Sequence, residues 1–227
     1  MSLGEAPVQV VAVSAGTSEP STTRMLADRA AQAVVTRLRD SGRNAAVRVI
    51  ELAPIAAEIA QTLVSGLPAA AVQEAIGHLA AADALVVSTP VYKAALSGLF
   101  KSFIDVLDDD LLIAKPVLLA ATAGSARHAM VADDHLRPLF AFLRAIPAPT
   151  SLFAAPEDWG AADLSKRVDR AAGELAALIA SGVGRDIADA GWAAYQHTFG
   201  GNATRAQRTG KDVDLDSDLM RLARGEA

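Results

Sequence analysis

The chain has 227 residues, no cysteine, 52% apolar residues and a formal net charge of −5 at pH 7. Its length predicts one domain with a sizeable core. The negative charge argues against nucleic-acid binding, and the lack of cysteine excludes disulfides, a catalytic thiol and thiolate metal sites. The segment Met1–Pro7 lacks the pattern of a signal peptide, and the longest apolar stretch, Leu111–Gly124, is too short for a bilayer. We therefore expect a cytoplasmic protein that binds neither nucleic acid nor membrane.

Short apolar runs alternate along the chain with longer segments of helical periodicity. The expected strands are Val8–Val13, Val47–Leu52, Ala84–Ser88, Val117–Ala121 and Thr150–Ala154. The expected helices are Thr22–Ser41, Ile55–Ser65, Pro68–Ala82, Leu96–Leu107, His128–Ile146 with a bend at Pro138, and Ala161–Ser181. This alternation predicts an α/β three-layer sandwich, with a five-stranded parallel sheet in the flavodoxin-like order 2-1-3-4-5. Its ligand would bind beyond the carboxyl ends of strands one, three and four.

The loop after the first expected strand, Ser14–Thr23, is rich in Gly, Ser and Thr and leads into a helix. Backbone N–H groups and the positive end of the helix dipole make such a turn a phosphate site. The loop lacks the lysine of a P-loop and the second and third glycines of the dinucleotide fingerprint. It therefore predicts a cradle for a terminal monophosphate. Taken alone, it could equally be an ordinary capped turn.

Two further loops, Ser88–Lys101 and Ala121–His128, follow the third and fourth expected strands. They contain the runs Pro90-Val91-Tyr92-Lys93-Ala94, Ser97-Gly98-Leu99-Phe100-Lys101 and Gly124-Ser125, and Leu136-Arg137-Pro138 comes shortly after. With the first loop, these motifs resemble the NAD(P)H-dependent FMN reductases of flavodoxin-like fold. The most similar subgroup supplies reduced flavin to two-component luciferase-like and sulfonate monooxygenases. The resemblance extends over residues 8–180.

The resemblance implies a role for each loop. The residues that would hold the FMN phosphate are Ser14, Ser21, Thr22 and Thr23, with Gly16 in the same loop. Those that would line the ribityl chain and isoalloxazine ring are Pro90, Val91, Tyr92 and Lys93. Those that would contact the pyrimidine edge of the flavin are Thr122, Gly124 and Ser125.

The implied reaction is hydride transfer from NADPH or NADH to N5 of FMN, after which reduced FMN leaves for a partner monooxygenase. It requires no metal and no catalytic side chain, so no catalytic residue is assigned. His128 and His135 share a helix face, but no third metal ligand is evident. Two other functions stay open: an FMN-bound quinone or azo-dye reductase, and an electron carrier of the flavodoxin type. Either Arg127 or Lys93 could meet the 2′-phosphate that distinguishes NADPH from NADH.

We expect residues 1–183 to form the flavodoxin-like domain and residues 184–227 to form a tail that is partly helical or disordered. In the tail, Asp212–Asp218 resembles a helix start. Faces rich in Ala and Leu at Leu96–Leu107 and His128–Ile146 predict a homodimer or homotetramer. Some family members carry a π-bulge in the latter helix, at a tetramer contact. The sequence leaves open whether Asp133–Leu136 forms one.

Overall fold

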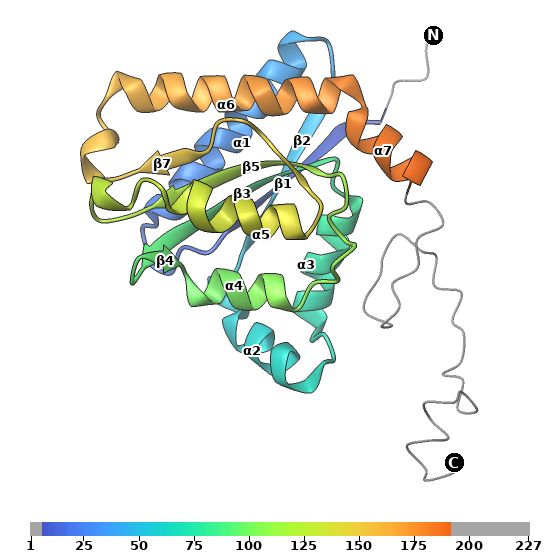
Figure 1. The fold of residues 1–227 in the computed structure, drawn as a ribbon, viewed down its shortest axis with the longest axis vertical. Helices are drawn as coiled ribbons and strands as arrows, with labels where there is room; N and C mark the ends of the chain where they lie inside the picture. Colours follow the sequence, from blue (N-terminus) through green and yellow to red (C-terminus); the bar gives the residue numbers. More distant parts are fainter. Residues whose placement is uncertain (1–5, 192–227) are drawn as a thin grey trace.

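The computed structural model describes residues 6–191, which form a sheet with helices packed on both faces (Figure 1). The strands are β1 (Val8–Ser14), β2 (Ala45–Glu51), β3 (Ala84–Tyr92), β4 (Ala95–Leu96), β5 (Pro116–Thr122), β6 (Ile146–Pro147) and β7 (Leu152–Ala154). The α-helices are α1 (Thr22–Asp40), α2 (Ala56–Ser65), α3 (Ala70–Ala81), α4 (Gly98–Asp105), α5 (Arg137–Phe142), α6 (Ala162–Ser181) and α7 (Val183–Gly191). Short 3₁₀ turns cover Ala53–Ile55, Ala126–His128 and Pro156–Asp158.

The sheet confirms the flavodoxin-like α/β arrangement but not the predicted strand count. It has seven strands in the order β2-β1-β3-β5-β6, with β4 paired antiparallel to β3 and β7 paired parallel to β5. The expected fifth strand, Thr150–Ala154, corresponds to β7, and the additional short strand β6 pairs with the start of β5. Pro147 ends β6 and Pro149 follows it, and a proline has no N–H for the strand ladder.

Successive residues of the central strands pack on opposite faces of the sheet, as strand geometry requires. In β1, Val11 and Val13 join the apolar cluster beneath α3, α4 and α5, whereas Val10 and Ala12 join the cluster beneath α1 and α6. Both sets are buried, so the strands are continuous apolar runs rather than alternating ones. Figure 1 shows the resulting three layers.

The predicted helix His128–Ile146 is wrong as one continuous element. The chain instead forms the 3₁₀ turn Ala126–His128, the π-helix η3 (Ala132–Leu136) and the short helix α5. Pro138 does not bend a long helix; it lies in the first turn of α5, where a missing N–H is tolerated. His135 therefore lies within a π turn, which answers the question that the sequence left open.

The two ends of the sheet differ. Helix α7 lies beside the start of β5, far from β4 in Figure 1, and its Ala188 packs against Ile113 and Ala114. The loops that follow β1, β3 and β5 lie at the other end.

No single helix in residues 6–191 is long and apolar enough to cross a membrane. The 90°-bent pair Ala53–Ser65 and Ala70–Ala81 is long and apolar enough only when its two helices are taken together, by length and composition alone. The helix expected near Asp212–Asp218 lies outside the described residues.

Candidate functional site

The carboxyl ends of β1, β3 and β5 bring the three predicted loops to one edge of the sheet. Ser14 of β1 pairs with Ser88 of β3, and Pro90 of β3 pairs with Thr122 of β5. The strands are parallel neighbours, so the segments that follow them are adjacent in space, although Ser14 and Ser88 are 74 residues apart in sequence and Pro90 and Thr122 are 32 apart. The edge is therefore the predicted ligand position of this fold.

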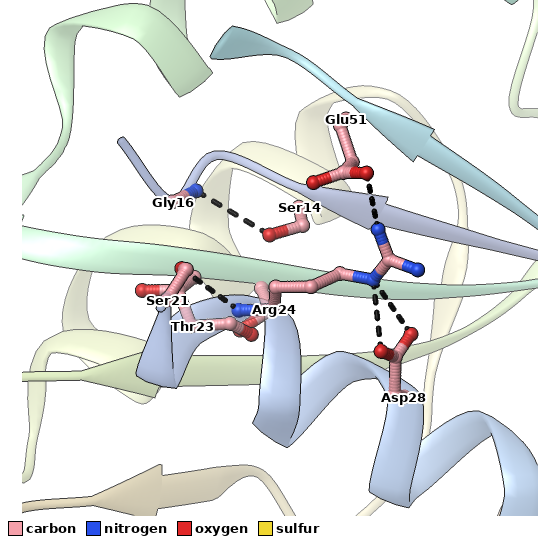
Figure 2. A network of polar contacts seen from close by, with 8 residues as sticks. Ser14, Gly16, Ser21, Thr23, Arg24, Asp28 and Glu51 are labelled. Carbon is pink, nitrogen blue, oxygen red and sulfur yellow. Dashed lines mark hydrogen bonds and ion pairs between the residues drawn. The ribbon is translucent and has the colours of Figure 1, made fainter. Parts of the chain in front are cut away.

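The first loop turns tightly against the start of α1 (Figure 2). The Gly16 N–H donates to Ser14 Oγ at 3.3 Å, and Ser21 Oγ caps α1 by accepting from the Arg24 N–H at 3.2 Å. A Cβ on Gly16 would lie 1.9 Å from Ser21 Oγ, so only glycine fits beside the cap. The first backbone bond of the helix runs from Met25 N to Ser21 O. The amides of Thr22 and Thr23 precede this bond at the positive helix end.

Buried hydroxyl groups connect the start of α1, which follows this loop, to strands β3 and β5. The Oγ1 atoms of Thr23 and Thr122 are 2.7 Å apart, and Ser88 Oγ donates to the Thr23 carbonyl at 3.0 Å. All three side chains are buried. Sequence reasoning missed Ser88; its only signal was a hydroxyl at the end of an apolar strand. These contacts join β3, β5 and the start of α1 into one unit.

The second loop is a two-residue hairpin between β3 and β4. Lys93 and Ala94 form its turn with φ of 52° and 64°, the left-handed backbone that hairpins normally fill with Asn and Gly. The turn leaves Tyr92 exposed, with its hydroxyl 3.0 Å from Thr17 Oγ1 of the first loop. The hairpin thus holds the Tyr92 hydroxyl against the first loop. Sequence reasoning did not anticipate the partner, Thr17.

Replacing Ala94 by Gly is expected to raise the free energy of unfolding by about 1 kcal/mol, because glycine adopts a positive φ without the clash of a Cβ. Urea unfolding of the variant would measure the gain. The matched control is Ala129→Gly, at a residue with φ of −57°, where glycine should destabilise instead. Equal destabilisation by both substitutions would contradict the strain assigned to the turn.

The third loop leaves β5 through Ala123, whose N–H donates to Ala154 O of β7 at 3.2 Å. Gly124 is exposed and Ser125 is partly exposed, and a Cβ on Gly124 would meet no atom within 4 Å. Their backbone is therefore accessible from the carboxyl edge.

Arg24 was also missed by sequence reasoning. Its Nε donates to both carboxylate oxygens of Asp28 at 2.8 and 2.9 Å, and its Nη1 pairs with Glu51 Oε1 (Figure 2). Partial burial lowers the pKa of the Arg24 guanidinium, but hydrogen bonds and charges from Asp28 and Glu51 raise it by more, so the pKa lies above its usual value. The guanidinium is therefore charged at neutral pH.

The structure divides the predicted site residues into two groups. Those with buried side chains are Ser14, Thr23, Pro90 and Thr122. Those with exposed or partly exposed surface are Gly16, Ser21, Thr22, Val91, Tyr92, Lys93, Gly124 and Ser125. A ligand at this edge would touch the second group, and the first group would hold it in place.

Residues 6–191 contain a cavity away from this edge and no cluster of metal-ligating side chains. No group of three or more His, Asp and Glu side chains in this range could hold a metal ion. A cavity of about 220 Å³ lies at the opposite end of the sheet, where Asp83, Lys115 and Arg185 contribute to its lining. It contains none of the predicted site residues.

Comparison with known proteins identifies the family. Residues 8–160 match the family model described as NADPH-dependent FMN reductase. An FMN reductase (NADPH) of Pseudomonas aeruginosa is 43% identical over 155 residues, which cover 67% of this chain and 80% of that protein. The NADH-dependent FMN reductase SfnE of Pseudomonas putida is 42% identical over 149 residues, covering 66% and 77%.

A solved structure agrees with these matches. An oxidoreductase from Corynebacterium diphtheriae superimposes with a TM-score of 0.76 at 43% identity, covering 78% of this chain and 99% of that chain. The resemblance noted in the loop motifs is confirmed, since the match with the family model includes all three loops. The chain belongs to the NADPH-dependent FMN reductase family of oxidoreductases.

Proposed function

We propose that this chain reduces FMN with NADPH or NADH at the carboxyl edge of its sheet and releases reduced FMN to a partner monooxygenase. The observation that carries the proposal is the open amino end of α1 beside the Ser- and Gly-rich first loop. Bound there, FMN would supply the chemistry by accepting a hydride from the nicotinamide at N5. Reduced nicotinamide nucleotide is a cytoplasmic reductant, so we assign the activity to the cytoplasm.

The residues present fit the phosphate of FMN. The first turn of α1 contains no acidic residue, so its positive end has no carboxylate of its own there. Thr22 is exposed at this end, and the absence of a side chain on Gly16 lets the Ser21 hydroxyl lie close against the first loop. We assign the phosphate to Ser21, Thr22 and the neighbouring amides.

The other loops would orient the flavin ring and the nicotinamide. Pro90 and Val91 present a rigid strand end to the ribityl chain, and Tyr92 and Lys93 present exposed side chains to the ring. The backbone of Gly124 and Ser125 would donate hydrogen bonds to the pyrimidine edge, where reduction places negative charge. Ser14, Thr23 and Thr122 act as supports beneath the loops.

An acceptor assay tests the reaction. NADPH and NADH oxidation is followed with the purified protein alone, with added free FMN, and with a quinone or azo dye. Oxidation that depends on free FMN supports the proposal. Oxidation with quinone or azo dye by an FMN-bound protein would favour the alternative reductase, and no oxidation with any acceptor would favour an electron carrier.

We propose that residues 1–183 form the catalytic domain. Stopping the chain after Val183 is expected to lower the unfolding free energy by about 1–2 kcal/mol, because the rest of α7 buries Ala188 and brings Gly184 against Ala114 O. FMN affinity should not change, since all three loops precede residue 130. Titration and urea unfolding would be compared with a control chain stopped after Gly191, which keeps α7. Loss of FMN binding in the shorter, folded chain would show that α7 supports the site.

We also propose a homodimer or homotetramer, with the tetramer contact at η3. Met130, which precedes η3, and Phe142, the last residue of α5, are 59% and 65% exposed, so each offers apolar surface that a second copy could cover. Light scattering at micromolar concentration should give a mass of two or four chains. A monomer under these conditions would refute the proposal.

A further inference from the structure

Arg24 is the single basic residue between Ser14 and Met25, the segment that forms the proposed phosphate cradle. It does not face the cradle as an unpaired cation. Its guanidinium is shared between Asp28, one turn further along α1, and Glu51, at the end of β2. The three side chains are partly exposed, at 29%, 45% and 52%.

The contact with Glu51 closes a ring around the first loop. Glu51 is the register partner of Ser14, and the next residue, Leu52, donates its N–H to Ser14 O at 2.9 Å. At the other end of the loop, the Arg24 N–H is held by Ser21 Oγ. The loop therefore leaves the sheet at Ser14 and rejoins it, through Arg24, beside the same residue.

We infer that Arg24 is a positioning residue for phosphate binding: its bridge from Asp28 to Glu51 fixes the first turn of α1 against Ser14. This inference rests on the proposed assignment of the FMN phosphate to this loop. With the bridge in place, Ser21 and the Thr22 amide keep a fixed separation from Ser14 and Gly16. Without it, α1 is held at this end only by packing and by the buried Thr23 contacts.

A purely electrostatic role would predict the opposite behaviour for Glu51. If Arg24 only neutralised nearby carboxylates, then Glu51→Gln would remove a negative charge close to the phosphate and tighten FMN binding. If Arg24 instead holds α1 against Glu51, then Glu51→Gln replaces an ion pair with a weaker neutral hydrogen bond, loosens the contact and weakens FMN binding. The sign of this one substitution separates the two roles.

The experiment measures dissociation constants for FMN and riboflavin by flavin fluorescence in four variants of the full chain: Arg24→Gln, Glu51→Gln, the double variant, and Arg24→Lys. We expect about two- to fivefold weaker FMN binding in each Gln variant, as for a partly exposed ion-pair network, with riboflavin affinity unchanged. The double variant should be no weaker than either single one, because all three break the same bridge. The FMN affinity of Arg24→Lys should be intermediate, because the compact ammonium group of lysine lacks the planar set of donors with which the guanidinium contacts both Asp28 and Glu51.

The matched control is Arg29→Gln. Arg29 lies on the same helix and also makes a tertiary contact, with Ser165 Oγ of α6, but away from the loop. The Arg29→Gln substitution should leave the affinities for FMN and for riboflavin unchanged.

Tighter FMN binding in Glu51→Gln, or equal loss of FMN and riboflavin binding in the Gln variants, would overturn the inference. So would unchanged FMN affinity in every variant. If the unmodified chain itself does not distinguish FMN from riboflavin, the proposed phosphate assignment fails, and that result is separate from the behaviour of Arg24. Should Arg24→Gln not fold, Glu51→Gln and Arg24→Lys still decide the question.

Discussion

Replacing Ser21 and Thr22 together by alanine is expected to weaken FMN binding about 100-fold or more while riboflavin binding stays the same. Each hydrogen bond from a hydroxyl to a charged phosphate contributes about 1.5–3 kcal/mol, and two such losses correspond to a factor of this size if they add. Ser21 also caps α1 through the Arg24 N–H, so the variant should lose about 1 kcal/mol of folding stability as well.

The control for this variant removes two hydroxyls from the far end of the same helix. Thr36 Oγ1 donates to Gln32 O, and Ser41 Oγ donates to Leu38 O. The double change Thr36→Ala and Ser41→Ala should affect stability slightly and neither flavin. If Ser21→Ala and Thr22→Ala instead weaken FMN and riboflavin equally, the loop does not bind the phosphate, and the site assignment fails.

Replacing Gly16 by alanine should have the next largest effect, because the new Cβ would occupy the place of the Ser21 hydroxyl. It would lie 1.9 Å from Ser21 Oγ, 3.0 Å from Ser21 Cβ and 3.2 Å from Thr23 Cβ. The serine must rotate out of its capping position, which costs about 1 kcal/mol for the cap and about 1–3 kcal/mol for the overpacked turn. FMN affinity should fall about tenfold or more, as expected for one lost charged hydrogen bond.

Urea unfolding and FMN titration would measure both consequences of Gly16→Ala. The matched control is Gly77→Ala in α3, where a Cβ meets no atom within 4 Å and should stabilise the helix by about 0.5–1 kcal/mol. If the Gly16→Ala protein has unchanged stability and unchanged FMN affinity, then Gly16 and Ser21 do not lie as close together as described, and the prediction is wrong.

The fold was predictable wherever the local pattern and the tertiary structure agree. The predicted helices Thr22–Ser41 and Ala161–Ser181 match α1 and α6 to within one residue at each end, because clear apolar periodicity and end signals bound them. The segment after β5 was not predictable in this way. Its helical periodicity is real, but the π turn before Pro138 and the turns around Met130 depend on packing against the sheet.

The three loops of the site could be predicted because hydroxyls, glycines and a proline follow successive strands of a recognisable order. What the sequence could not give is which side chains face outward. Thr23 and Thr122 resemble ligand-binding hydroxyls in sequence, yet they contact each other and are buried. Glu51 and Arg24 lie on different elements with 26 residues between them, so no local pattern relates them.

The hydroxyl pair of Thr23 and Thr122 gives the protein a native spectroscopic reporter. The proton between the two oxygens is shielded from water, since both side chains are nearly fully buried, and it can exchange only when the start of α1 separates from β5. Burial of this pair favours slow exchange with water, which is the condition under which a hydroxyl proton becomes observable by NMR. Its chemical shift would report the occupancy of the adjacent loop, and its exchange rate would report how often the sheet edge opens, both without an attached label.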